Sequence, residues 1–209
     1  MLCAYYEYMK SKKIVLGSKS VGRKRILEDA GLVLDVLESG FEEDLKKEDY
    51  NSPMEYVEAT CKGKVESLLS KDIDFDLLIV ADCVCTVGQK VIEKPIDKSD
   101  HVRMIKELRD SKFHNVITTV TLIFRNNGNQ TIKHLNAVCE VEFANIPDCS
   151  IEKYLDYFPH CINVSGGYEM LKSGNSIVKN IKGSPSNVYG IPVCEVCEHI
   201  VDAIENKLL

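Results

Sequence analysis

Residues 77–82, Leu-Leu-Ile-Val-Ala-Asp, are the stretch that decides the fold. The unbroken apolar run predicts a buried strand, which delivers the carboxylate of Asp82 to its C-terminal end. After a tight turn at residues 87–90 the chain returns through Ile-Glu-Lys-Pro at 92–95, where the proline holds Lys94 in an extended backbone. Ligands of α/β sheets bind at the open ends of strands, so we predict that Asp82 and Lys94 face one cleft. The alternatives are an aspartate and a lysine that serve only their own turns.

The segments on either side of this strand predict a mixed α/β sheet. We expect strands at residues 14–16, 32–37, 77–86, 115–124, 131–143 and 176–181, and helices at 21–30, 52–68, 99–108, 147–155 and 193–208. Strands alternate with helices at both ends of the chain and a hairpin lies in the middle, so the sheet is not purely parallel. Residues 1–12 are expected to form a disordered leader, and residues 13–209 a single domain.

Composition limits the classes of function. The net charge of −6 argues against binding to DNA or RNA, although it leaves room for a nucleotide ligand. No apolar run approaches the roughly 20 residues needed to cross a bilayer, and the first residues do not form a signal peptide. The nine cysteines show no disulfide framework, which indicates reduced thiols and a cytoplasmic location.

The turn Gly-Ser-Lys-Ser-Val-Gly-Arg at residues 17–23 is the second candidate site. Ser20 is expected to cap the following helix, and the N–H groups of a helix start attract phosphate. Ser18 offers a hydroxyl and Arg23 a charge-assisted hydrogen bond. The alternative is an ordinary strand-to-helix turn with solvated basic residues. The turn is not a Walker A loop, because the Gly-Lys-Ser/Thr ending is missing.

Three further groups leave alternatives open. The acidic run Glu-Glu-Asp at 42–44 can supply a metal ligand or be a solvated surface. Lys62 and Lys64 lie on different sides of one predicted helix, so one of them could reach a phosphate; the alternative is that they are solvated. The Cys-x-x-Cys at 194–197 lies in a late helix without a second ligand pair, which favours buried thiols over a redox or metal site.

These motifs, in this order, resemble the Maf family of nucleoside triphosphate pyrophosphatases. The family's Ala-Ser-x-Ser-Pro-Arg-Arg corresponds to residues 17–23, Gly-Ala-Asp-Thr to 80–83, Leu-x-Lys-Pro-x-Asp to 92–97, His-x-Val-x-Thr to 114–118 and Val-x-Gly-Leu-Pro to 188–192. The likeness covers about residues 13–205. No single motif is specific, but their order along nearly the whole chain is.

The resemblance implies a fold and an activity. The fold is an elongated mixed sheet flanked by helices, with two lobes around a central cleft. The activity is metal-dependent cleavage between the α and β phosphates, with Mg²⁺ or Mn²⁺, to a nucleoside monophosphate and pyrophosphate. Family substrates are dTTP, UTP and modified pyrimidine nucleotides, or methylated GTP in a sister group. The implied role is housecleaning of the nucleotide pool by a cytoplasmic homodimer.

The resemblance also assigns roles to six residues. It implies catalytic roles for Asp82, Lys94 and Glu43, substrate binding by Ser18, Arg23 and Lys64, and metal binding by Asp82 and Glu43. It thereby selects Lys64 over Lys62 and Glu43 over Glu42.

The chain departs from the family pattern at three places. Gly22 replaces the first arginine of the Arg-Arg pair, and Val21 replaces the proline before it. In the segment 163–172 an Asp-Lys pair is missing and Leu171 stands in place of a glutamine. The alternatives to an active enzyme are therefore a nucleotide-binding protein with weak or lost turnover, and a regulatory or scaffolding protein that keeps only the fold.

Overall fold

The computed structural model describes residues 2–209 and shows a mixed sheet of seven strands. The strands follow the order β2-β1-β3-β5-β6-β7, and β4 pairs with β3 beside this path. Their bounds are Ile14–Leu16 (β1), Asp35–Val36 (β2), Leu77–Val87 (β3), Lys90–Ile92 (β4), His114–Asn126 (β5), Asn129–Phe143 (β6) and Val178–Lys182 (β7). β1 runs parallel to β2 and β3, whereas all other pairs are antiparallel. The predicted mixed α/β sheet is confirmed, although the strand expected at 32–37 is shorter.

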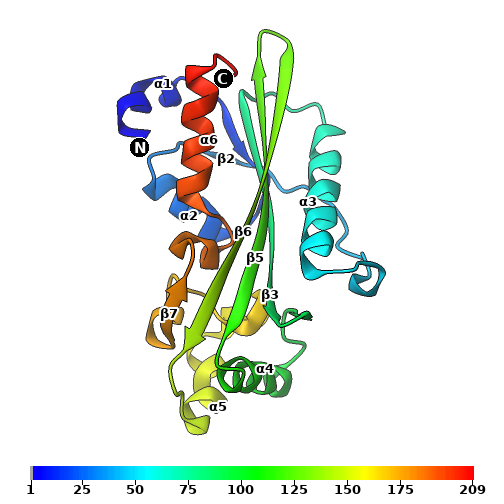
Figure 1. The fold of residues 1–209 in the computed structure, drawn as a ribbon, viewed down its shortest axis with the longest axis vertical. Coiled ribbons are helices and arrows are strands. Elements are labelled where there is room, and N and C mark those ends of the chain that lie inside the picture. The colour runs from blue at the N-terminus through cyan, green and yellow to red at the C-terminus, as the bar shows by residue number, and fades with distance from the viewer. Residues whose placement is uncertain (1) are drawn as a thin grey trace.

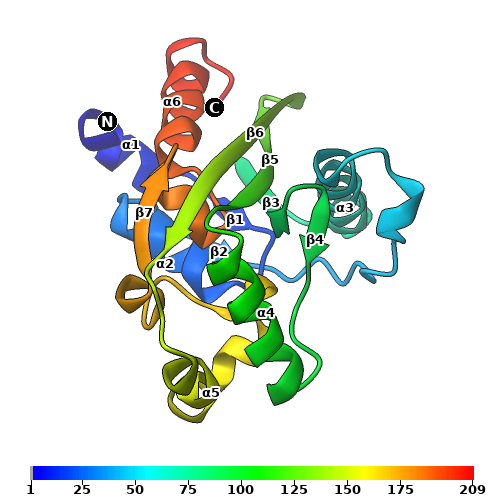
Figure 2. The same cartoon turned by 60° about the horizontal axis from the view of Figure 1, so that its bottom comes forward.

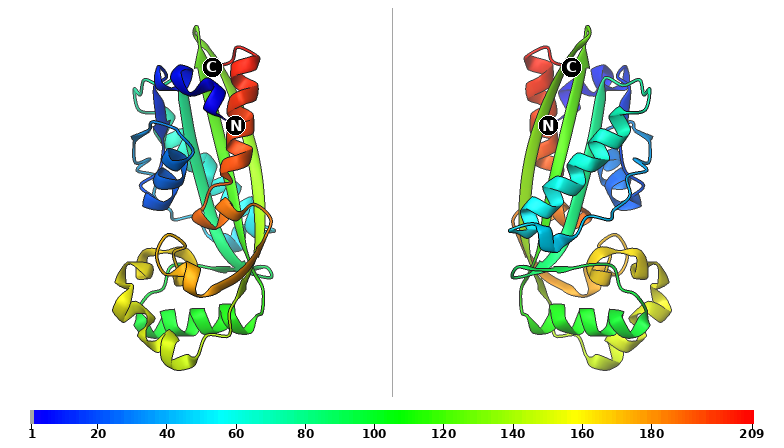
Figure 3. Two further views of the ribbon diagram at one scale, coloured as in Figure 1. Left: turned by 90° about the vertical axis from the view of Figure 1, so that its left-hand side faces the viewer. Right: turned by 90° about the vertical axis from the view of Figure 1, so that its right-hand side faces the viewer.

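Helices cover both faces of the sheet. Their bounds are Tyr6–Lys10 (α1), Val21–Asp29 (α2), Pro53–Leu69 (α3), Lys98–Asp110 (α4), Asp148–Tyr157 (α5) and Val193–Glu205 (α6). Figure 1 shows α1, α2 and α6 on one side of the long β5–β6 ribbon and α3 on the other. Figure 3 shows the same ribbon running on into a second lobe that contains α4 and α5. None of these helices is long and apolar enough to span a membrane.

The alternation of side chains along β3 explains how two helical layers share one strand. Leu77, Ile79 and Ala81 pack into the cluster formed with α2 and α6, whereas Leu78 and Val80 pack against α3. Successive residues of a strand point to opposite faces, so an unbroken apolar run is what a doubly covered strand requires. A separate cluster around Met104, Ile105 and Ile151 forms the core of the second lobe. The expected elongated, two-lobed architecture is therefore present.

Local capping signals in the sequence worked at two helices and failed at a third. The side chains of Ser20 and Ser52 accept hydrogen bonds from the first turns of α2 and α3, as predicted. At α4 we expected Ser99 to be the cap, but Asp97 takes that place and accepts from the backbone N–H of Asp100. The Asp97 carboxylate also accepts from the Ser99 hydroxyl, so the serine assists the cap.

The N-terminal segment differs from the expected disordered leader. Leu2–Tyr5 forms a 3-10 helix that continues into α1, and Met1 lies outside the described residues. Leu2 and Met9 are buried in the same cluster as Ile200 of α6. The hydroxyl of Tyr8 also donates a hydrogen bond to the backbone carbonyl of Leu209. Burial of apolar side chains against the C-terminal helix orders a segment whose composition alone looked loose.

Candidate active site

Asp82 lies in the middle of β3, at the point where parallel pairing stops. β1 pairs only with residues 77–79 of β3, and β4 pairs only with residues 85–87. Between them one edge of β3 is open at Asp82. The strand expected at 77–86 is present and runs to Val87, so Asp82 follows the apolar run but lies within the strand and not at its end. What opens the sheet is the end of the neighbouring strand β1, which has the same consequence for a ligand.

Asp82 meets a buried lysine from α3. Lys64 Nζ lies 2.5 Å from Asp82 Oδ1 and 2.6 Å from Glu43 Oε1. Both Lys64 and Asp82 are more than nine-tenths buried, at 9% and 8% exposure. Lys94 Nζ lies 3.9 Å from the other oxygen of Glu43. Four residues that are distant in the sequence therefore form one continuous chain of alternating charges.

The helical spacing of α3 explains why Lys64 rather than Lys62 faces the sheet. Val57, Cys61, Lys64 and Leu68 lie three or four residues apart and are all buried. This spacing places them on one face of the helix. Lys62 lies off that face, is exposed and pairs with Glu66. Lys64 stands at an apolar position of an amphipathic helix. This spacing could have distinguished it from Lys62 in the sequence, but the prediction did not use it.

Opposite charges favour the ionised forms of Lys64 and Glu43. Burial by itself lowers the pKa of Lys64, but attraction to Asp82 and hydrogen bonds to Asp82 and Glu43 outweigh it, so the pKa is raised. Burial by itself raises the pKa of Glu43, but the hydrogen bond and charge of Lys64, helped by Lys94, lower it. The acidic run at 42–44 thus contributes a single member, Glu43, to the cluster. Glu42 forms no ion pair within residues 2–209.

Arg23 is buried and its guanidinium is bound to the protein itself. Nε donates to the Gly190 carbonyl at 2.8 Å, and Nη1 donates to the Ala81 carbonyl at 2.8 Å and to Ser18 Oγ at 3.1 Å. Nη2 contacts Cys83 Sγ at 3.1 Å. Arg23 therefore joins the β1–α2 turn to β3 and to the segment before α6. Four of its five N–H donors are engaged.

The same contacts leave the Ser18 hydroxyl ready to donate. Ser18 Oγ accepts hydrogen bonds from Arg23 Nη1 at 3.1 Å and from the Ser20 backbone N–H at 3.2 Å. A hydroxyl has two acceptor lone pairs and one donor. With both lone pairs in use, the O–H of Ser18 remains available as a donor, and a phosphate oxygen is a suitable acceptor.

Gly190 and Cys83 belong to this arrangement but were not among the predicted residues. Gly190 has φ +79°, and a Cβ there would lie 2.8 Å from Cys83 Sγ and 3.0 Å from Arg23 Nε. Only glycine fits beside the buried guanidinium. The glycine of the Gly-Ile-Pro motif indicated a position with a special backbone conformation. Nothing in the motif indicated that Gly190 lies against Arg23.

Two of the departures from the family pattern lie next to each other. A Cβ at Gly22 would meet Leu171 Cδ1 at 3.8 Å, an ordinary van der Waals distance. Leu171 follows a loop that is tied to the exit of β4, where the Gly166 N–H donates to the Glu93 carbonyl. The missing arginine and the missing glutamine are therefore neighbours, and a small residue and an apolar one meet at that position.

The donor set can hold a divalent cation only with help from a ligand. Asp82 Oδ1 and Glu43 Oε1 both lie within 2.6 Å of the Lys64 ammonium, so the two carboxylates are close together, and the second oxygen of each is the one left for a metal ion. Within residues 2–209 no group of three or more His, Cys, Asp or Glu side chains forms a metal cage. Mg²⁺ is commonly held by one or two carboxylates, waters and substrate phosphates, which fits this pair.

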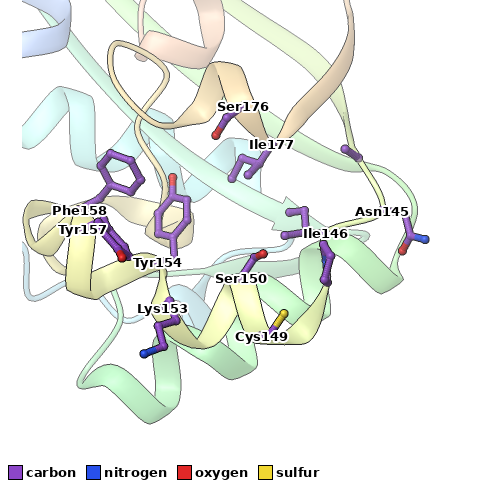
Figure 4. Close-up of a pocket in the computed structure, with 12 residues that line it drawn as sticks. Asn145, Ile146, Cys149, Ser150, Lys153, Tyr154, Tyr157, Phe158, Ser176 and Ile177 are labelled. Carbon is purple, nitrogen blue, oxygen red and sulfur yellow. The ribbon is translucent and has the colours of Figure 1, made fainter.

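His114 and the Cys-x-x-Cys segment lie apart from the cluster. The pKa of His114 is lowered by burial to about 4, and its Nε2 lies 2.9 Å from the Tyr168 hydroxyl, which indicates a structural role. Cys194 is exposed and Cys197 is buried on α6, and all nine cysteines are free thiols. A cavity of about 510 Å³ lies beside α5 and contains none of the six predicted residues (Figure 4).

All six predicted residues come together around β3. Figure 2 shows the elements that carry them, with α2 on one side of β3 and α3 and β4 on the other. A family model described as "Maf-like protein" matches residues 13–203. The chain is 31% identical over 215 residues to a dTTP/UTP pyrophosphatase of Schizosaccharomyces pombe, covering 96% of this chain and 87% of that one. It is 30% identical over 185 residues to a dTTP/UTP pyrophosphatase of Anaeromyxobacter dehalogenans, covering 88% and 90%.

A human relative is longer than this chain. The "Probable bifunctional dTTP/UTP pyrophosphatase/methyltransferase protein" is 30% identical over 210 residues, which are 96% of this chain but 34% of that protein. The chain therefore spans about a third of the length of this relative. A solved nucleoside-triphosphatase from Mycobacterium abscessus aligns with 65% of this chain and 74% of that one, at 11% identity and a TM-score of 0.35.

Proposed function

Since the chain belongs to the Maf family, we propose that it hydrolyses nucleoside triphosphates to nucleoside monophosphates and pyrophosphate. The observation that carries the proposal is the buried Lys64 ammonium between the carboxylates of Asp82 and Glu43, with Lys94 beside them. Such a cluster at an open sheet edge offers both the anions that bind a metal and the cations that bind phosphate. The names of the relatives favour dTTP and UTP as substrates.

In the proposed mechanism the side chains orient water and offset charge. Asp82 Oδ1 is held by Lys64, while Oδ2 makes no hydrogen bond to residues 2–209 and is the oxygen that orients or deprotonates the attacking water. The water attacks the α-phosphorus, the bond to the bridging oxygen breaks, and pyrophosphate leaves. Lys94 offsets the charge that develops on the leaving group. The Ser18 hydroxyl donates to a phosphate oxygen, and Arg23 keeps the Ser18 turn in place.

We propose that Asp82 and Glu43 hold Mg²⁺ or Mn²⁺ when the triphosphate binds. When bound there, the ion would lower the pKa of a water molecule and offset charge on the phosphates. Lys64, which contacts both carboxylates, would keep them close together. The pair of carboxylates favours a metal that arrives together with the substrate, since two protein ligands alone leave most of its coordination sphere unfilled.

The test is pyrophosphate release from a panel of dTTP, UTP, CTP, GTP, their modified forms and 7-methyl-GTP, with Mg²⁺ and with Mn²⁺. We expect release from a pyrimidine triphosphate, which disappears in Asp82→Asn and persists in Asp72→Asn. Asp72 is exposed and serves as a matched control. Release at the wild-type rate in Asp82→Asn contradicts the assignment of the base.

The second candidate function is nucleotide binding without turnover. Contact between Gly22 and Leu171 favours it, because both the charge of an arginine and the hydrogen bonds of a glutamine are missing there. It predicts metal-dependent binding of dTTP or UTP, measured by calorimetry, and no pyrophosphate release from any nucleotide. Turnover of one nucleotide in the panel excludes it.

We propose that the protein acts in the cytoplasm as a homodimer. The nine free thiols support a reducing compartment. The dimer follows only from the family and is tested by light scattering during gel filtration. A mass of one chain, 23.5 kDa, at concentrations that support activity contradicts it.

A further inference from the structure

The cationic side chains that face the proposed triphosphate site are few. Arg23 donates to four groups of the protein, and Lys64 lies between two carboxylates. Three cations and two carboxylates leave one net positive charge in the cluster. Lys94 is the cation with the freest side chain, at 60% exposure. A triphosphate carries several negative charges. A metal ion and the exposed Lys94 therefore leave some of these charges without a cationic partner.

Lys19 lies where a further cation is needed. It stands between Ser18, whose hydroxyl is free to donate, and Ser20, the cap of α2. Its Nζ contacts Glu38 Oε1 at 2.6 Å. Glu38 precedes the connection that carries Glu43 into the cluster. The pKa of Lys19 is raised, chiefly by the hydrogen bond and charge of Glu38. The charge of Glu43 also raises this pKa, and the charge of Lys64 lowers it.

The ion pair that holds Lys19 is easily exchanged. The side chains of Lys19 and Glu38 are 79% and 59% exposed. Exposed pairs of this kind are weak and are screened by salt. A phosphate group offers more charge and more acceptor oxygens than one carboxylate. The long lysine side chain can therefore change partner when a triphosphate is present.

We propose that Lys19 leaves Glu38 and pairs with the pyrophosphate part of the bound triphosphate. The inference rests on the proposed function and adds a substrate-binding residue to it. The α-phosphate reacts at the buried Asp82, whereas the Lys19 side chain is exposed. Lys19 is therefore placed to contact the β and γ phosphates, which leave as pyrophosphate. Glu38 competes for Lys19 in the free protein and occupies it until substrate arrives.

The experiment compares four single variants and one double variant by titration calorimetry with two probes, inorganic pyrophosphate and α,β-methylene dTTP, both with Mg²⁺. Lys19→Gln removes the cation, Lys19→Arg keeps it, and Glu38→Gln removes the competitor. Lys62→Gln is the matched control, because Lys62 is also a paired surface lysine, with a side chain that is 77% exposed. Melting curves establish that each variant is folded.

We expect Lys19→Gln to lower the affinity for both probes about tenfold, which is the effect expected from losing one charge-assisted hydrogen bond at an exposed position. Lys19→Arg stays within about threefold of wild type, and Lys62→Gln within about twofold. Glu38→Gln binds more tightly than wild type, and this gain disappears in the double variant Lys19→Gln/Glu38→Gln. The effect of Lys19→Gln shrinks when salt is raised, because the contact is exposed.

Equal affinities of Lys19→Gln and Lys62→Gln for both probes, in a protein whose wild type binds them, overturn the inference and leave the proposed function standing. A wild-type protein that binds neither probe overturns the proposed function and the inference with it. Binding is measured without turnover, so a catalytically silent protein still gives a decisive answer about Lys19.

Discussion

Lys64 Nζ lies 2.5 Å from Asp82 Oδ1, and neither residue is more than 9% exposed. Burying two charges is unfavourable unless they remain paired. The second contact of Lys64, to the half-exposed Glu43, extends the pair towards solvent. The chain thus retains a costly arrangement at the gap between β1 and β4 along β3, which is typical of a functional site.

Removing the cation of this pair should destabilise the fold. Lys64→Met leaves the Asp82 carboxylate buried without a partner, and we expect a loss of about 3 kcal/mol in the free energy of unfolding. Urea denaturation at pH 7 measures it. Lys62→Met, a change of the same kind at an exposed position, should alter stability by no more than about 0.5 kcal/mol.

The double variant Lys64→Met/Asp82→Asn separates an unpaired charge from lost packing. Because it also removes the carboxylate, it should recover part of the stability lost in Lys64→Met. A double variant as unstable as the sum of the two single changes contradicts the view that the two charges are coupled.

Replacing Gly190 should break the site through Arg23. In Gly190→Ala the new Cβ lies within 3.0 Å of Arg23 Nε and meets Cys83 Sγ at 2.8 Å, at a φ of +79°. We expect a loss of about 1–3 kcal/mol in stability and a fall in nucleotide affinity, because the Ser18 turn loses its anchor. Chemical denaturation and calorimetry measure the two effects.

The control is Gly128→Ala at the tip of the β5–β6 hairpin. Gly128 also has positive φ, but its Cβ position meets nothing within 4 Å. The alanine there should share the backbone strain and leave nucleotide affinity unchanged. Equal losses of affinity in the two variants contradict a role of Gly190 in positioning Arg23.

Gly22 offers room for the missing cation. Its Cβ position meets its nearest neighbours at 3.7–3.8 Å, so a side chain fits without strain. Gly22→Ala should stabilise the protein by about 0.5 kcal/mol, because glycine is unfavourable in a helix. Gly22→Arg should in addition raise nucleotide affinity about tenfold.

The comparison for Gly22→Arg is Val21→Arg, which adds the same charge at the preceding residue of α2. Val21 is 72% exposed. If both arginines raise the affinity for dTTP equally in calorimetry, then general attraction, and not a contact at position 22, is the cause.

Acid should destabilise the protein through His114. This residue is 1% exposed, and burial lowers its pKa to about 4 from an ordinary value of 6.5. The unfolded chain therefore binds the proton first, and stability falls as the pH drops from 6.5 towards 4. The full loss is about 3 kcal/mol from this group.

Denaturation at several pH values checks this in wild type, His114→Gln and His134→Gln. His114→Gln should remove the steeper part of the loss between pH 6.5 and 4. His134 is exposed, so His134→Gln should keep it. The same pH dependence in His114→Gln and wild type contradicts the assignment.

Several features of this protein follow from the sequence by itself, because they depend on neighbours in the chain. The apolar run at residues 77–81 specifies a buried strand, and Ser20 and Ser52 cap their helices. Each is a matter of side-chain alternation or of a hydrogen bond within one turn. The resemblance to the Maf family also pointed to all six residues that gather around β3.

The tertiary structure decided which charges meet and how. The pairing of β1 with β3 ends at Ile79, which leaves the edge of β3 unpaired at Asp82. Packing of α3 on β3 inserts Lys64 between two carboxylates, and the fold surrounds Arg23 with acceptors from three segments. Apolar burial against α6 orders the N-terminal residues that composition alone suggested were loose. These outcomes depend on contacts between residues far apart in the chain. The free energy of such contacts cannot be inferred from a local sequence pattern.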